Sequence, residues 1–225
     1  MAVSTSPQSI GLFGGTFDPV HAGHLALAGH VLERCRLDRL LFIPAPEPPH
    51  KRRPEASFAH RTAMLEAALA DCPHRARMAL SLIEADLPTP SYTIRTVEAL
   101  MAHHGRNRYF LVIGADSLRD LPHWHRGTEL LARVSLIVVR RDGTGPGEPG
   151  RILTELASGF VPGTEPHSWR GPTGTTLTYL DDVHFPVSSS SIREQLRRGE
   201  TPVMLPPAVF AYIRSHCLYG WQRPA

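Results

Sequence analysis

The chain has 225 residues, of which 42% are hydrophobic and 20% are charged, and its formal net charge is +3. A chain of this length and composition can bury a full core, and it lies outside the range of disordered sequences. Its longest apolar run, Val134–Val139, is far shorter than the roughly 18–20 residues of a membrane span. Because residues 1–9 lack the features of a signal peptide, we expect a cytoplasmic protein with no membrane partner.

The basic residues and the cysteines exclude further classes. Lys51 is the only lysine, and it follows His50, so the chain has no Walker-type phosphate loop. The three cysteines are too far apart for a disulfide framework or a paired-cysteine zinc site. The arginines alternate with acidic residues and form no long basic run, which favours small anionic substrates over nucleic acid.

Short apolar runs alternate with segments of helical period, which predicts an α/β fold: a doubly wound, Rossmann-like parallel sheet with helices on both faces. We expect one domain over residues 1–225, with strands at Ile10–Phe13, Arg39–Pro44, Met78–Ile83, Tyr109–Ile113, Val134–Val139 and Thr176–Leu180, the last as an outer strand. The expected helices are Ala22–Cys35, Ser57–Asp71, Tyr92–His104, Ser190–Arg198 and Ala208–His216, and the last two form a small C-terminal helical region over about residues 188–219.

Capping residues and composition refine these elements. Ser57 and Ser91 are the predicted N-terminal caps of the second and third helices, and Gly105 is expected to end the third. Residues 142–175 are rich in Gly, Pro, Thr and Ser, which indicates a long surface excursion. Ligands of such sheets lie at the carboxyl ends of the strands. Three segments are therefore expected to meet at one rim: Gly14–His24, Gly114–Trp124 and Ser188–Arg193.

The first of these segments has the composition of a phosphate site. Gly14 and Gly15 allow close approach of the backbone, and the amides at a helix start attract anions. His21 and His24 are three residues apart, so they share a face of the first helical turn and can donate to phosphate oxygens. A plain turn with two surface histidines, or a metal site, stays open as an alternative.

The other candidate residues each have two interpretations. Ser188–Ser191 can cap a helix, with Arg193 as a phosphate fork or as a solvated side chain. Asp116 can accept ribose hydroxyls, help to place a metal, or cap a helix. Trp124 can stack on a flat ring or anchor the core. Thr93 can face the substrate or the surface, and Lys51 can bind a phosphate or lie solvated in its loop.

The string Gly14–His24 resembles the GGTFDPxHxGH signature of bacterial nicotinate-nucleotide adenylyltransferases, within the HxGH nucleotidyltransferase superfamily. Val187–Arg193 is similar to the ISSTxIR motif of the superfamily. Ser91–Thr93, Gly114–Ser117 and Leu121–His125 are similar to the motifs on the mononucleotide side. The resemblance covers about residues 10–219, apart from the Gly/Pro-rich stretch.

The resemblance implies transfer of an adenylyl group from ATP, with Mg²⁺, to nicotinate mononucleotide, giving deamido-NAD and pyrophosphate in NAD biosynthesis. It implies catalytic roles for His21, His24 and Arg193, with His24 stabilising the transition state. It places on ATP the residues Gly14, Gly15, Thr16, Phe17, His21, His24, Ser188, Ser189, Ser190 and Arg193. It places on the mononucleotide Thr93, Asp116, Trp124 and Lys51, with Trp124 stacked on the pyridine ring and nearby amides contacting the carboxylate.

Two positions depart from the family pattern. Ser190 replaces the threonine of ISSTxIR, which keeps the hydroxyl, and Gly127 stands where many relatives carry a second tryptophan. The acceptor could instead be nicotinamide mononucleotide or phosphopantetheine, and the chain could be a non-catalytic nucleotide-binding module. The sequence leaves open whether the chain forms a homo-oligomer.

Overall fold

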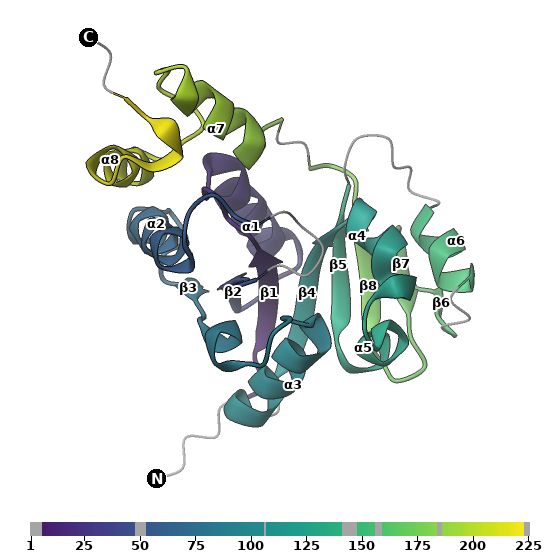
Figure 1. Cartoon of the computed structure of the whole chain (residues 1–225). Coiled ribbons are helices and arrows are strands. Elements are labelled where there is room, and N and C mark those ends of the chain that lie inside the picture. The colour runs from purple at the N-terminus through teal and green to yellow at the C-terminus, as the bar shows by residue number, and fades with distance from the viewer. Residues whose placement is uncertain are drawn as a thin grey trace.

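The computed structural model describes residues 6–47, 53–105, 107–140, 148–155, 159–183 and 186–222. In this part of the chain, eight strands form one sheet in the order β3-β2-β1-β4-β5-β8-β7-β6 (Figure 1). Six strands pair in parallel: β1 (Ser9–Gly15), β2 (Arg39–Pro44), β3 (Met78–Leu80), β4 (Arg108–Gly114), β5 (Ser135–Val139) and β8 (Thr176–Leu180). The predicted doubly wound parallel sheet is confirmed.

Helices cover both faces of the sheet, and neighbouring strand residues alternate between two cores. Val112 of β4 joins one core, whereas Leu111 and Ile113 join the other. The first core includes residues of α1 (Ala22–Arg34), α2 (Phe58–Ala70), α7 (Ser189–Arg197) and α8 (Pro207–Ser215). The second includes residues of α3 (Thr93–His104), α4 (Ala115–Asp120), α5 (Gly127–Arg133) and α6 (Glu148–Glu155). Figure 1 shows α7 and α8 beside α1 and α2. Within the described ranges, no helix is both long and apolar enough to span a membrane.

The predicted helix ends are mostly confirmed. Ser57 Oγ accepts the His60 N–H at 3.3 Å and caps α2, and Gly105, with φ of 70°, ends α3. The cap at Ser91 is wrong, because α3 begins at Thr93 with Tyr92 in the cap position and Ser91 is buried.

The predicted strand over 78–83 is too long. β3 ends at Leu80, and Ile83–Asp86 forms a 3₁₀ helix, η1. The cause is Glu84, whose buried carboxylate accepts the Thr96 hydroxyl of α3 at 2.7 Å and turns the chain inward. Burial raises the pKa of Glu84, and the Thr96 hydrogen bond opposes that rise.

The predicted surface excursion over 142–175 contains a helix and two strands that were not predicted, although most of its described residues are exposed or half-buried. α6 buries Ile152 and Leu153 in the second core. Two short strands, β6 (Val161–Pro162) and β7 (Ser168–Arg170), then extend the sheet in antiparallel fashion beyond β8, which is therefore not an outer strand. Short strands separated by Gly and Pro give too few alternating residues to stand out in the sequence.

The strand order creates one crevice. The chain runs from β1 outward to β2 and β3, then returns to the other side of β1 for β4 and β5. At such a switch point the loops after the two central strands diverge, and ligands bind at their carboxyl ends. β1 ends at Gly15 and β4 at Gly114, so the loops that follow these glycines form the candidate site.

Candidate active site

The loop after β1 is shaped by tight contacts of its own backbone. Phe17 has a left-handed backbone (φ of 51°), and its ring lies 2.9 Å from the position that a Cβ on Gly15 would occupy. A Cβ on Gly14 would meet no atom within 4 Å. The backbone of Gly14 therefore borders open space at the rim, where a ligand can approach it closely.

A buried arginine holds this loop in place. Arg61 of α2 is 1% exposed, and its guanidinium donates to the carbonyl of Thr16 at 2.7 Å. It also donates to the carbonyls of Ala45 and Pro46, which follow β2, at 2.9 and 3.1 Å. Burial lowers the pKa of Arg61, and the nearby Asp18 carboxylate counters this. This residue was not predicted, because an arginine on the inner side of a helix belongs to no sequence motif.

The two motif histidines lie face to face. Their ring centroids are 3.7 Å apart and the rings are inclined by 24°. The prediction that His21 lies in the first helical turn is wrong. His21 occupies the N-terminal cap position of α1 and has an extended backbone. It is 5% exposed, and burial lowers its pKa to about 4, so its ring is neutral at neutral pH. The more accessible His24 ring lies against it.

The ring of His24 is fixed on two sides. Its Nδ1 accepts the His21 backbone N–H at 3.3 Å, so in the neutral ring the proton lies on Nε2, where it can be donated to an anion. Its other neighbours are aromatic: the Phe17 and Phe13 ring centroids lie 5.1 and 6.0 Å away. These rings pack on Phe42 of β2, so the imidazole is supported by the core.

Helix α7 docks on the same loop. A Cβ on Gly23 would lie 2.4 Å from Cγ1 of Val187, so the glycine between the two histidines permits the close approach of α7. Ser188 caps α7 by accepting the Ser191 N–H at 3.1 Å, as predicted. The Ser189 hydroxyl donates to the carbonyl of Pro19 at 2.9 Å. These contacts join the third predicted rim segment to the first.

Arg193 lies at this junction. Its Nη1 donates to the backbone carbonyl of Asp18 at 2.7 Å, and its Nε donates to the Glu55 carboxylate at 2.9 Å. Ser190 Oγ is 3.4 Å from its Nη2. Partial burial opposes ionisation of Glu55, but hydrogen bonds from Arg197 and the charge of Arg193 lower its pKa. Arg193 and the histidines are thus linked through one loop, although the sequence analysis gave Asp18 and Glu55 no role.

The second rim segment follows β4. Asp116 is exposed in the first turn of α4, and the segment continues through the 3₁₀ helix η2 (Leu121–His123) to Trp124. Trp124 is half-buried against the second core. The His125 ring stacks on Tyr92 at 4.4 Å, which brings the start of α3, where Thr93 lies, to the Trp124 turn.

Charges and a close backbone contact fix this turn. The Arg126 guanidinium donates to Glu98 of α3 and to Glu129 of α5, and Arg126 and then Arg133 lower the pKa of Glu129 to about 2. A Cβ on Gly127 would lie 2.3 Å from the Leu121 carbonyl oxygen. The backbone here therefore has no room for a tryptophan, or for any other side chain, at residue 127.

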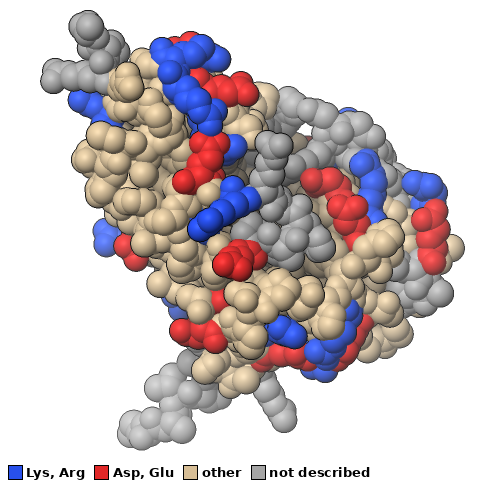
Figure 2. All heavy atoms as spheres, viewed as in Figure 1, with Lys and Arg blue, Asp and Glu red and all other residues tan. Residues whose placement is uncertain are grey.

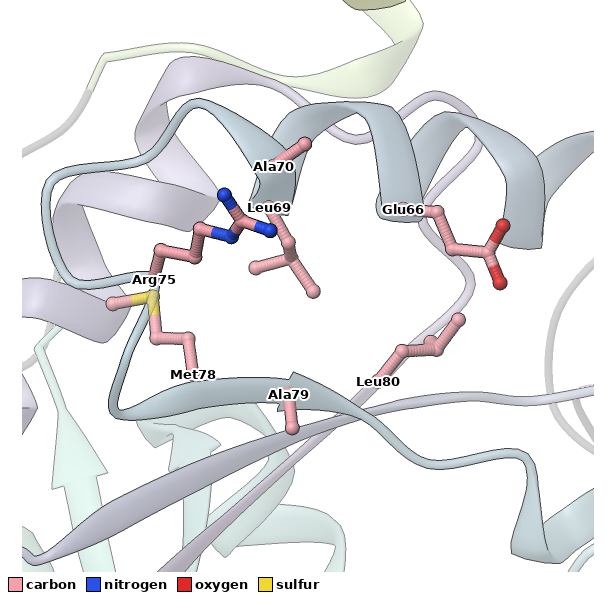
Figure 3. Close-up of a pocket in the computed structure, with 7 residues that line it drawn as sticks. All are labelled: Glu66, Leu69, Ala70, Arg75, Met78, Ala79 and Leu80. Atoms are coloured by element: carbon pink, nitrogen blue, oxygen red, sulfur yellow. The ribbon is translucent and has the colours of Figure 1, made fainter.

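The remaining features lie outside these contacts. Lys51 falls outside the described residues. The described residues hold no group of three or more His, Cys, Asp or Glu side chains arranged to bind a metal. Figure 2 shows basic and acidic side chains interspersed over the visible face. A separate cavity of about 290 Å³, lined by residues of α2 and β3 such as Glu66, Met78 and Leu80, contains no predicted site residue (Figure 3).

Comparison with known proteins identifies the family. Residues 12–195 match the cytidylyltransferase-like family. Proteins named probable nicotinate-nucleotide adenylyltransferase from Gloeobacter violaceus and Bacillus pumilus are 38% and 40% identical to this chain. Each aligns with 94% of this chain, and the alignments cover 96% and 98% of the relatives. This chain belongs to the nicotinate-nucleotide adenylyltransferase family. It is a nucleotidyltransferase, as the sequence motifs predicted.

Solved structures agree on the fold of this nucleotidyltransferase. The Plasmodium falciparum nicotinic acid mononucleotide adenylyltransferase complexed with NaAD superimposes with a TM-score of 0.73 at 17% identity. The alignment covers 96% of this chain and 98% of that one. A second structure of the Plasmodium enzyme, complexed with APC, gives a TM-score of 0.71 at 16% identity.

Proposed function

We propose that this nucleotidyltransferase transfers the adenylyl group of ATP to nicotinate mononucleotide, forming nicotinate adenine dinucleotide and pyrophosphate in NAD biosynthesis. An oxygen of the mononucleotide 5′-phosphate attacks the α-phosphorus of ATP, a new P–O bond forms, and the bond to the β-phosphate oxygen breaks. A phosphate is already ionised and nucleophilic at neutral pH, so no general base is required. The protein must position two anions and offset the charge that develops between them.

The observation that carries this proposal is the junction of the histidine pair with α7. His24 would donate from Nε2 to a phosphate oxygen that gains charge as the bond to the leaving group breaks. The stacked, neutral ring of His21 would hold the orientation of His24. His21 would also contact ATP. The amides of Gly14, Gly15, Thr16 and Phe17 would approach the nucleotide along the open backbone after β1.

The far end of the triphosphate would lie over α7. Arg193, oriented by Asp18 and Glu55, would contact the β- and γ-phosphates together with Ser188, Ser189 and Ser190. We expect ATP to enter as its Mg²⁺ complex. A Mg²⁺ ion held mainly by phosphates and water needs no preformed protein cage, which fits a described site without a cluster of ligands.

The loop after β4 would hold the acceptor. Trp124, half-buried beside the Tyr92–His125 stack, would place its exposed part against the pyridine ring. Asp116 and Thr93 would contact the ribose and phosphate of the mononucleotide. Lys51 remains a candidate for a mononucleotide phosphate.

The acceptor is tested by measuring pyrophosphate release from MgATP with nicotinate mononucleotide, nicotinamide mononucleotide and phosphopantetheine in turn. We expect nicotinate mononucleotide to give the highest kcat/KM. Faster turnover of another acceptor would change the assigned substrate. No pyrophosphate release with any of the three would favour the non-catalytic binding module.

Replacing Trp124 with alanine should raise the KM for nicotinate mononucleotide about tenfold or more, since stacking on an aromatic ring contributes roughly 1–3 kcal/mol per base. The KM for ATP should change little. Trp169→Ala is the matched control, because Trp169 is also half-buried against the second core but lies on β7. A rise confined to the KM for ATP would reverse the assignment of the two sides.

A further inference from the structure

The last turn of the chain reaches the loop that carries the motif histidines. Tyr219 lies in η3 (Leu218–Gly220), and its hydroxyl donates to Oδ1 of Asp18 at 2.7 Å. Both residues are buried: Tyr219 is 7% exposed and Asp18 is 5% exposed. Tyr219 lies beyond the segment 12–195 that matches the family, and no sequence motif of the site includes it. A buried hydrogen bond therefore joins two segments that lie 201 residues apart in the sequence.

The carboxylate that receives this hydrogen bond organises a second segment of chain. Asp18 Oδ2 accepts the backbone N–H of Glu55 at 2.8 Å, and Oδ1 accepts that of Ala56 at 3.1 Å. Tyr219 is thus the third donor to one buried carboxylate. Removing its hydroxyl would leave a buried charge with one partner fewer, which costs more than losing an exposed hydrogen bond.

Asp18 and Glu55 also orient Arg193. Its Nη1 donates a hydrogen bond to the backbone carbonyl of Asp18 at 2.7 Å. Its Nε donates to the carboxylate of Glu55 at 2.9 Å. The Asp18 carboxylate therefore holds the backbone of Glu55, and the Glu55 side chain in turn orients the guanidinium of Arg193. We call Asp18, Glu55, Arg193 and Tyr219 the Asp18 cluster.

The orientation leaves Arg193 able to bind an anion. A guanidinium has five N–H groups, and the contacts with Glu55, Asp18 and Ser190 use three of them. Among the described residues, one N–H on each terminal nitrogen therefore remains for phosphate oxygens. Two such donors on one plane match the geometry of a phosphate group.

The conformation of η3 places the Tyr219 side chain against Asp18. Cys217 and Tyr219 both have left-handed backbones, with φ of 49° and 59°, a conformation that non-glycine residues adopt only when their surroundings require it. The turn is anchored by Trp221, whose ring meets Phe210 of α8 edge to face at 5.0 Å. Burial, and then the Asp18 carboxylate, raise the pKa of Tyr219, so its hydroxyl stays protonated and remains a donor.

We infer that Tyr219 is a positioning residue for catalysis: by holding the Asp18 carboxylate, it presents Arg193 to the β- and γ-phosphates of ATP. This inference rests on the proposed role of Arg193 in ATP binding. It assigns to the last turn of the chain a function in recognising the triphosphate. It also predicts that the effect of Tyr219 is confined to ligands that carry β- and γ-phosphates.

The test compares the binding of MgATP and of AMP to Tyr219→Phe by calorimetry. We expect the Kd for ATP to rise about tenfold and the Kd for AMP to stay within twofold of wild type, because AMP lacks the phosphates that Arg193 would contact. Tyr212→Phe is the matched control: its hydroxyl also forms a hydrogen bond, to His60 Nδ1 at 3.0 Å between α8 and α2, outside the cluster. This variant should bind both ligands as wild type does.

A double variant distinguishes a positioning role of Tyr219 toward Arg193 from a general loss of structure. In an Arg193→Ala background, Tyr219→Phe should weaken ATP binding no further, because the group it positions is gone. Unchanged ATP binding in Tyr219→Phe, equal weakening of ATP and AMP, or an additive effect with Arg193→Ala would each overturn the inference. If Tyr219→Phe does not fold, Asp18→Asn carries the same test with the same expected contrast between ATP and AMP.

The outcome is independent of the acceptor. The binding measurements need no mononucleotide, so they decide the role of Tyr219 even if pyrophosphate release shows a different substrate. Failure of the proposed function would appear in the acceptor assay of the wild-type protein. Failure of this inference would appear in the binding of ATP and AMP to the Tyr219 variants.

Discussion

His24→Ala should lower kcat for adenylyl transfer at least ~100-fold, the scale of removing one preorganised donor to a developing negative charge. The imidazole is held by the His21 N–H and by the Phe13 and Phe17 rings, so its Nε2 proton is placed before the substrate arrives. Such a donor acts mainly in the transition state, and we therefore expect the KM for ATP to change only a few-fold. Single-turnover pyrophosphate release measures the chemical step directly.

His30→Ala is the matched control for this variant. His30 lies on the same helix, with its Nε2 3.3 Å from Asp182, and no role in the site is proposed for it. It should keep wild-type kcat, and thermal melting should show that both variants fold. A His24→Ala protein with kcat within threefold of wild type would show that the imidazole has no part in the transition state.

Arg61→Met should lower the free energy of unfolding by about 3 kcal/mol, because three part-buried carbonyls lose their donor and the new side chain cannot replace it. Those carbonyls belong to the loops after β1 and β2, so the loss also loosens the backbone of residues 14–17. Displacement of a binding group by even 1 Å costs up to about 100-fold in rate. We expect at least a tenfold rise in the KM for ATP. Steady-state kinetics measure this rise, and urea unfolding of the same variant measures the loss of stability.

Arg77→Met distinguishes a local effect from general destabilisation. Arg77 also donates to two backbone carbonyls, those of Leu32 and Leu37, but it does so at the start of β3. This variant should lose stability and keep the wild-type KM for ATP. An equal rise in KM for both variants would show that Arg61 has no specific influence on the loop.

The parts of the fold set by local patterns were predictable. β2 and β8 begin and end at the predicted residues, and Ser57, Gly105 and Ser188 cap helices as their residue types predict. The rim was predictable from the strand–helix alternation, because parallel strands place the loops after them at one edge. The ligand roles of the rim residues remain predictions.

The contacts that connect distant segments could not be predicted. Arg61 occupies an inner position of α2, where the helical period predicts an apolar residue, and the carbonyls that it binds after β1 and β2 are distant in the sequence. Tyr219 is paired with Asp18 across 201 residues, and one sequence gives no signal of such a pairing. Gly127 appeared as a departure from the family pattern, but its cause is the Leu121 carbonyl oxygen against its backbone.

The pairing of Asp18 with Tyr219 has a consequence for biosynthesis of the protein. Residues 9–24 are translated before Ser189, Arg193 and Tyr219, which hold that segment. All eight strands of the sheet also precede Tyr219 in the sequence, so the hydrogen bond that it donates to Asp18 forms only after the residues of the sheet have been translated. We therefore expect a chain truncated before Tyr219 to bind ATP more weakly than the chain that contains it.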